Sequence, residues 1–124
     1  MLVTEFEFTL PKGYLDAEGT LHRKGIMRLA RAMDEIAPLK DPRVKANPAY
    51  VTVIILSRVI LKLGALDDVN PMIVENFFAE DLNFLQQFYR HINGLTERGS
   101  SSSASTARDP VIEVGSDELR SGQP

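Results

Sequence analysis

The chain opens with an alternation of apolar and polar residues that is typical of a half-buried β-strand. Every second residue from Glu5 to Leu10 is apolar, so Phe6, Phe8 and Leu10 are expected to face a core while the polar residues between them face water. PKG at 11–13 is expected to end this strand.

A second turn is expected at DAEG, residues 16–19, with short strands on either side of it that would form an antiparallel hairpin or meander. Gly13, Gly19 and Gly25 recur at equal intervals, but this spacing matches neither a dinucleotide-binding fingerprint nor a P-loop. We interpret all three as turn glycines.

Residues 25–39 fit two periods at once. Ile26, Leu29, Met33 and Ile36 keep helical spacing, whereas the residues around Arg28 also allow a strand. We expect a strand to about residue 30 and then a short helix over 32–37, which the prolines that follow would end.

The most apolar stretch, NPAYVTVIILSRVILKLGAL at residues 47–66, is expected to form a helix over 48–64. A membrane span needs about 20 mostly apolar residues, and Ser57, Arg58 and Lys62 interrupt this one. As a helix it would carry Arg58 and Lys62 on one narrow stripe and apolar residues on most of its circumference. Such a helix is either central in a core or shared with a partner, and both alternatives stay open.

The last element begins with Asn70 as N-cap and Pro71 at the first helical position, and Gly94 is a natural stop. The helix is strongly amphipathic, with a break expected near residues 79–81. Its apolar face is wide and aromatic: Val74, Phe77, Phe78, Leu82, Phe84, Leu85, Phe88, Tyr89 and Ile92.

Asp81 falls within that apolar face, where a carboxylate needs a partner. One interpretation is an N-cap for the second piece of the helix, accepting a backbone N–H near Asn83 or Phe84. The other is an ion pair with Arg28, Arg58 or Lys62. Either way Asp81 is expected to be structural, as are Asn70 and Pro71.

From Arg98 onward the chain is rich in Ser, Gly and Pro and has few apolar residues, so residues 98–124 are expected to be disordered. Residues 1–97 are expected to form a single domain of the α+β class, with a short N-terminal antiparallel β-hairpin or meander followed by a small helical region.

This composition carries a first testable prediction. A chain that ends at Gly94 is expected to fold as well as the full chain, because the core-forming residues precede Arg98. Thermal unfolding of the two chains measures this. A large drop in the thermal midpoint of the shorter chain would contradict it.

Composition and charge exclude several functions. The 124 residues include no cysteine, so no disulfide or thiolate metal site is expected. The net charge of -3 is spread over interleaved acids and bases, which gives no basic patch for nucleic acid or for a membrane surface. No signal peptide is recognisable, so we expect a cytoplasmic protein.

No catalytic, cofactor-binding or metal-binding constellation is recognisable, so an enzyme is not expected. His22, expected in a turn, and His91, near the end of the last helix, are interpreted as surface histidines because no carboxylates lie at ligand spacing. Asp34 and Glu35 are adjacent, and adjacent helical side chains point apart, so they do not form an acid/base pair.

As an ordered set, four motifs resemble the tail assembly chaperones of contractile-tailed phages of the Mu and P2 type and their relatives in phage-tail-like particles. The motifs are FTLPKG, MRLARAMDE, the apolar helix that ends in SRVILKLG, and NPMIVENFFAEDLNFLQQFY with its Asp81. They span residues 5 to about 93, and each motif alone is weakly specific.

The resemblance implies a non-enzymatic protein that binds the long tape-measure protein, keeps it soluble while the tail tube assembles around it, and contacts the tail tube protein in some cases. The alternative is a structural subunit or adaptor that stays in the tail or contractile injection particle. A second copy of the chain is a further candidate partner. The expected binding face combines both helices: Val53, Leu56, Ile60, Leu63, Phe77, Phe84 and Phe88.

Overall fold

The computed structural model describes residues 2–95. It divides after Tyr89 into two compact parts, and each is considered by itself below. The predicted disorder of residues 98–124 and the predicted domain boundary at residue 97 lie outside the described residues.

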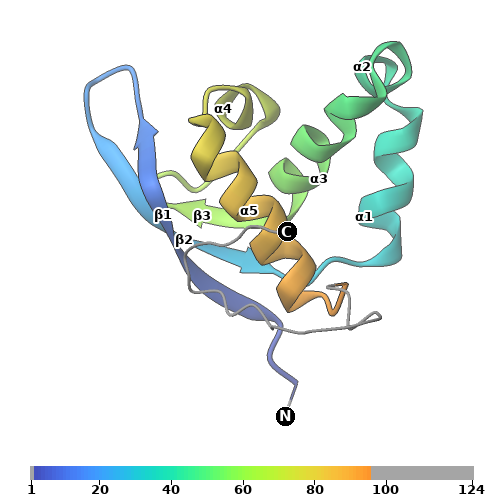
Figure 1. The fold of residues 1–124 in the computed structure, drawn as a ribbon, viewed down its shortest axis with the longest axis horizontal. Helices are drawn as coiled ribbons and strands as arrows, with labels where there is room; N and C mark the ends of the chain where they lie inside the picture. The colour runs from blue at the N-terminus through green and yellow to red at the C-terminus, as the bar shows by residue number, and fades with distance from the viewer. Residues whose placement is uncertain (1, 96–124) are drawn as a thin grey trace. The chain divides into compact units, whose positions relative to one another are not determined.

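Three strands and five α-helices make up the described residues, which places the fold in the predicted α+β class (Figure 1). The strands form one antiparallel sheet in the order β1-β2-β3. The elements are β1 (Glu5–Leu15), β2 (Leu21–Arg28), α1 (Ala32–Ile36), the 3-10 helix η1 (Ala37–Lys40), α2 (Pro42–Ala46), the 3-10 helix η2 (Pro48–Tyr50), α3 (Val51–Val59), β3 (Ile60–Leu63), α4 (Pro71–Glu75) and α5 (Ala79–Ile92).

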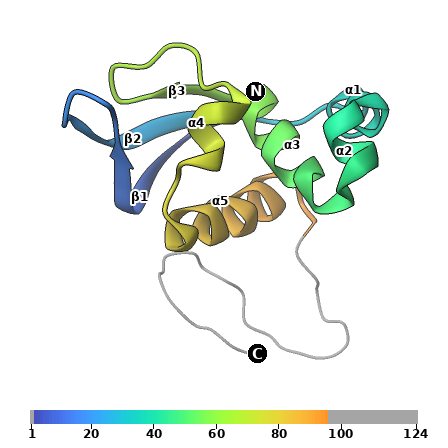
Figure 2. The ribbon, with the colours of Figure 1, turned by 90° about the horizontal axis from the view of Figure 1, so that it is seen from above.

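Helices lie on one face of the sheet. Figure 2 shows α5 on that side of the strands, with α3, α1 and α2 beside the sheet. The core lies between these layers and consists mainly of aliphatic side chains: Phe8, Leu10, Met27, Val44, Ile54, Leu56, Val59, Ile60, Leu63, Val69, Val74, Phe77, Leu85 and Tyr89. On the other face of the sheet, Glu7, Lys24 and Lys62 are exposed, and no described helix covers it.

The predicted alternation in β1 is confirmed, but the predicted end of the strand is wrong. Phe8 and Leu10 are buried and Phe6 is half-buried, as the pattern indicated. The strand continues through the PKG sequence to Leu15, with an irregular register between Thr9 and Tyr14. Four residues of β1 lie opposite Arg23 alone, so the chain forms a wide bulge there instead of a turn.

The predicted helix over 48–64 is correct only to Val59. Residues Ile60–Leu63 form β3, which pairs with β2 along the edge that β1 leaves open. Ile60 and Leu63 are buried, while Leu61 and Lys62 face outward. The stripe predicted to join Arg58 to Lys62 on one helix therefore does not exist. Backbone pairing explains the change, because without β3 the central strand would leave its N–H and C=O groups unpaired.

Gly25 is a strand residue, and its prediction as a turn glycine is wrong. It lies in the central strand between Phe8 of β1 and Leu63 of β3. A Cβ atom at this position would lie 2.5 Å from Cζ of Phe8 and 2.5 Å from the backbone oxygen of Lys62. Glycine is required here because the Phe8 ring lies across the strand.

The helix signals on either side of this region are confirmed. The strand and short helix predicted within residues 25–37 are the end of β2 and α1. Asn70 caps α4, its side chain accepting the N–H of Ile73 at 2.9 Å, and Pro71 is the first helical residue. The helix breaks at residues 76–78, slightly before the predicted place.

In the second part, α5 ends after Ile92 as predicted. The N–H of Leu95 donates to the C=O of Arg90 at 2.7 Å, and the N–H of Gly94 donates to the C=O of His91 at 3.2 Å. This pair of bonds is a Schellman motif, which satisfies carbonyl groups at the end of the helix.

Candidate interaction surface

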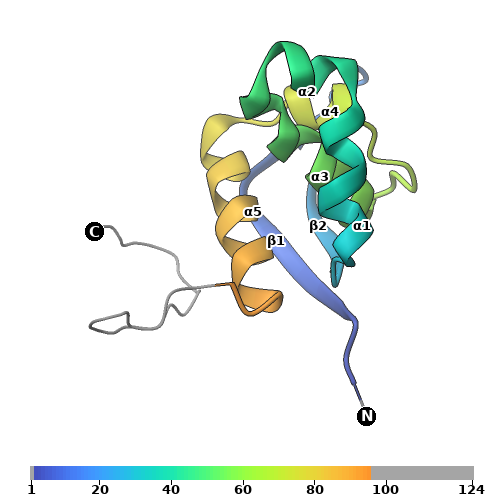
Figure 3. The same cartoon turned by 90° about the vertical axis from the view of Figure 1, so that its right-hand side faces the viewer.

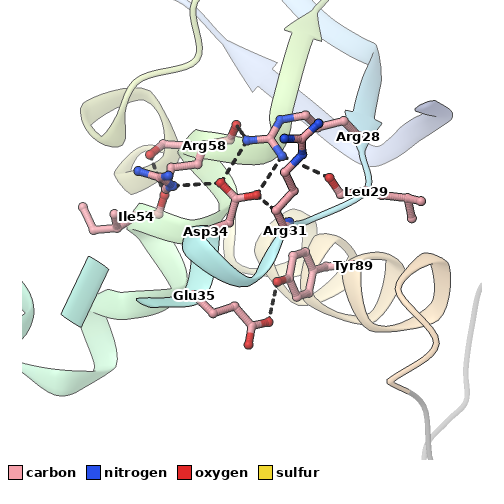
Figure 4. Close-up of polar contacts among 9 residues, drawn as sticks. Arg28, Leu29, Arg31, Asp34, Glu35, Ile54, Arg58 and Tyr89 are labelled. Atoms are coloured by element: carbon pink, nitrogen blue, oxygen red, sulfur yellow. Dashed lines mark hydrogen bonds and ion pairs between the residues drawn. The ribbon is translucent and has the colours of Figure 1, made fainter. Parts of the chain in front are cut away.

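Asp34 is the centre of a buried ion-pair network at the start of α1 (Figure 4). Its carboxylate accepts two hydrogen bonds from the Arg28 guanidinium, at 2.7 and 3.0 Å, and one from Nε of Arg58 at 3.0 Å. It also accepts the backbone N–H of Arg31 at 2.7 Å. The hydrogen bonds from Arg28, with those from Arg31 and Arg58, hold the pKa of the Asp34 carboxyl well below its usual value despite its burial.

This network joins three elements that are distant in the sequence. Arg28 is the last residue of β2, Asp34 lies in α1, and Arg58 lies in the last turn of α3. The Arg28 guanidinium also donates to the C=O of Arg58 at 2.9 Å. Bidentate contacts between arginine and a carboxylate fix orientation as well as distance, so α1 is held rigidly against the sheet and α3.

Glu35 ties α1 to a fourth element. Its carboxylate accepts the hydroxyl of Tyr89, in α5, at 2.6 Å. Burial, and then this bond to Glu35, raise the pKa of Tyr89. Asp34 and Glu35 therefore point to different partners, as expected for adjacent helical residues, and they do not act as a pair.

The segment formed by α1 and η1 also carries large apolar side chains that face water. Met33, Ile36 and Leu39 are 55%, 47% and 57% exposed. They recur every third residue along α1 and η1, which places them on one side of the segment. Figure 3 shows α1 in front of α3, on the outer side of this group of helices. We call these three residues the α1 stripe.

A second exposed apolar set surrounds the tip of the β1–β2 hairpin. Leu15 and Leu21 pair across the two strands, and both are about half exposed, as is Phe78. An open hollow of about 390 Å³ lies here, lined by Tyr14, Leu15, Asp16, Ala17, Asn76 and Phe78. Hydrophobic side chains around such a hollow are the ordinary features of a contact surface.

The predicted binding residues lie mostly in the core. Leu56, Ile60, Leu63 and Phe77 are buried, so they do not contact a partner while the fold is intact. The remaining three, Val53, Phe84 and Phe88, are half-buried. Phe88 packs edge-to-face on Phe8, with ring centroids 5.7 Å apart, and stacks on Phe84. These aromatic side chains pack over the sheet. Most of the predicted binding face is therefore used for packing inside the fold and is not available to a partner.

Sequence reasoning missed the α1 stripe because its residues also satisfied a helical core pattern. Met33 and Ile36 keep a helical spacing with Ile26 and Leu29, and this spacing gave no sign that they would be exposed. In the structure the segment instead turns Asp34 and Pro38 inward, both of which are buried. Arg28 and Arg58 could have indicated which side of α1 faces inward. Each follows or lies within an apolar segment, and an arginine there needs a carboxylate partner, which Asp34 supplies.

Asp81 is fully buried and holds the bulge of β1, so both of its predicted sets of partners were wrong. Its Oδ1 accepts the N–H of Lys12 at 2.8 Å and its Oδ2 accepts the N–H of Gly13 at 2.9 Å. These two amides belong to the bulge and have no strand partner. Gly13 has a φ of 109°, which an L side chain rarely adopts.

Arg23 completes the bulge from the other side. Its Nε donates to the C=O of Leu10 at 3.0 Å, and its guanidinium also reaches the C=O of Pro11. The carboxylate in α5 therefore satisfies two N–H groups of the bulge, and the guanidinium in β2 satisfies two of its carbonyls. The Asp81 contacts also join FTLPKG to NPMIVENFFAEDLNFLQQFY, two of the motifs that carry the resemblance.

His22 is buried in β2, which corrects its interpretation as a surface histidine in a turn. Its Nδ1 accepts the backbone N–H of Ala65, so its Nε2 carries the proton and donates to Asp16 at 2.8 Å. Asp16 also accepts the N–H groups of Glu18 and Thr20, and these contacts, with that of His22 first, lower the pKa of its carboxyl. The histidine thus fixes the hairpin turn.

Residues 2–95 contain neither a candidate metal site nor a helix that could span a membrane. No group of three or more His, Asp or Glu side chains within this range is placed to hold a metal ion. None of the helices there has the length and apolar character that crossing a membrane requires. Comparisons with protein-family models, curated proteins and solved structures gave no match to this chain.

Proposed function

We propose that this protein is a non-enzymatic tail assembly chaperone, which binds the tape-measure protein of a contractile phage tail or phage-tail-like particle in the cytoplasm of the producing cell and keeps it soluble. The observation that carries the proposal is the α1 stripe. Three large apolar side chains, each about half exposed, lie on α1 and η1, and polar contacts hold α1 against three other elements, β2, α3 and α5.

A holdase needs such a surface. Its client exposes apolar helix faces before assembly, and covering them removes apolar area from water at about 25 cal/mol per Å². Because hydrophobic contact is non-directional, one face can serve many similar segments of a long, repetitive client. A preformed face also avoids the entropy cost of ordering the site when the client binds.

Co-expression with the candidate tape-measure protein tests this proposal. The full chain is expected to move the client from the pellet to the soluble fraction, and Met33→Glu is expected to abolish most of that effect by placing a charge on the stripe. Met72→Glu is the matched control, because Met72 is 69% exposed on α4, outside the stripe. Equal client solubility with and without the wild-type protein would reject the proposal.

The alternative function, a structural subunit or adaptor of the particle, has a different signature. Analysis of purified particles is expected to find no copy of this protein if it acts only in assembly. Its presence at a fixed ratio to the tube protein would favour the structural role instead.

A further inference from the structure

We propose that the α1 stripe binds an amphipathic helix of a partner protein, with acidic residues on either side of the apolar face of that helix. This inference rests on the proposed function and specifies the chemistry of the client segment that the stripe would bind. Two properties of the segment around the stripe support it: the spacing of the apolar side chains and the sign of the charges beside them.

The spacing suits a helix. Met33, Ile36 and Leu39 form a single row, because side chains three apart lie above one another along α1 and η1. From the first to the last, the row is about 9–12 Å long, which is about two turns of a partner helix. Helices pack by placing such a row into the groove between rows of the partner's side chains. An amphipathic helix supplies that groove at its i, i+3 and i+4 positions.

The unpaired charges on residues 31–45, the segment that carries the stripe, are mostly positive, although the whole chain carries a net charge of -3. Arg31, Lys40 and Lys45 are exposed, and their side chains make no ion pair within residues 2–95. The nearby acids are already engaged. Asp34 is buried between Arg28 and Arg58, and Asp41 pairs with Arg43 at 2.9 Å.

Glu35 is the remaining carboxylate of the segment, and it accepts the Tyr89 hydroxyl on the α5 side. Residues 31–45 thus present three unpaired cations and one carboxylate, Glu35. A partner helix with Glu or Asp on its flanks would meet complementary charges, whereas a basic helix would be repelled. A second copy of the same stripe is disfavoured for the same reason, because Arg31 and Lys40 would meet their own equivalents.

Two synthetic peptides of about 20 residues, about 30 Å long when helical, serve as probes. They share one Leu face and differ only in their polar residues, Glu in one and Lys in the other. Fluorescence anisotropy with the full chain is expected to give about tenfold tighter binding of the acidic peptide, the effect of three weak exposed ion pairs. In 1 M salt, where the Debye length is about 3 Å, this preference is expected to vanish while apolar binding persists.

Variants assign the effect to the stripe. Ile36→Glu is expected to abolish binding of the acidic peptide, and Lys40→Glu combined with Lys45→Glu is expected to reverse the preference between the peptides. Met72→Glu again serves as the control and should change neither affinity. Thermal unfolding of each variant checks the fold, and Met33→Glu replaces Ile36→Glu if the latter unfolds.

Each outcome has one meaning. Equal affinities for the two peptides in low salt, or full binding by Ile36→Glu, would overturn the inference. Self-association of the wild-type chain that Ile36→Glu removes would also overturn it and would make a second copy the occupant. If the tape-measure protein stays insoluble while the peptide preference holds, the proposed function fails and the surface chemistry stands. If the client is kept soluble but the stripe variants behave as wild type, only this inference fails.

Discussion

Replacing Asp34 with alanine is expected to lower the free energy of unfolding at pH 7 by about 3 kcal/mol, near the lower end of the range for breaking a buried ion pair. The carboxylate is almost fully buried and accepts four hydrogen bonds, two from Arg28 and one each from Arg58 and Arg31. The two arginine side chains are 29% and 37% exposed. Water therefore hydrates them in part once their partner is gone, which limits the loss.

The pH dependence of this loss has a definite sign. The folded-state pKa of Asp34 is lowered below its unfolded value of about 3.9. Its contribution to stability is therefore complete well above pH 4 and is lost as the pH falls towards the folded-state pKa. Urea unfolding of wild type and of Asp34→Asn at several pH values measures it. The difference between the two proteins should shrink by about 1.4 kcal/mol per pH unit below about pH 4. A difference that is the same at pH 7 and pH 3 would contradict the ion-pair account.

Replacing Asp81 with alanine is expected to cost about 2–6 kcal/mol, because two backbone N–H groups of the bulge lose their acceptor, and each unsatisfied buried donor costs about 1–3 kcal/mol. Asp81→Asn is expected to fall between wild type and alanine. Its single amide oxygen can accept from Lys12 or Gly13, and its NH₂ group would face the other N–H. Chemical denaturation gives the size of the effect.

Hydrogen exchange gives the location of this effect, since the amides of Lys12 and Gly13 should both exchange faster in Asp81→Ala, and one of the two should exchange faster in Asp81→Asn. Glu80→Gln is the matched control. It removes only the exposed pair between Lys12 Nζ and Glu80, 3.0 Å apart, which is worth about 0–1 kcal/mol. If Asp81→Ala lowers the free energy of unfolding by no more than this control does, the bulge does not depend on the carboxylate.

Local signals predicted much of the backbone correctly. The alternation from Glu5 to Leu10 marks a strand because neighbouring side chains must point to opposite faces. Asn70 and Pro71 mark a helix start because their preferences act through groups within a few residues. The end of α5 near Gly94 is also determined locally, because its hydrogen bonds join residues that are three to five positions apart. The α+β class followed from these elements taken together.

The candidate site was predicted less well, since exposure is not a local property. Leu56 and Leu63 are apolar and buried, whereas Met33 and Leu39 are equally apolar and exposed. Only the packing of helices on the sheet separates them, because a small core accommodates a limited number of side chains. Asp81 was recognised as needing a partner, but its donors lie 69 and 68 residues away in sequence.

The sequence by itself therefore determined the elements whose cause lies within a few residues: the alternating strand, the helix start at Asn70 and Pro71, and the Gly94 stop. The tertiary structure alone decided that Ile60–Leu63 pairs as a strand, that Gly25 makes room for a ring, and that Arg28 and Arg58 converge on Asp34. Backbone hydrogen bonds and buried charges must find partners, and in a folded chain those partners come from distant positions. The exposed α1 stripe is one result, because satisfying Asp34 turns the polar side of α1 inward and its apolar side towards water.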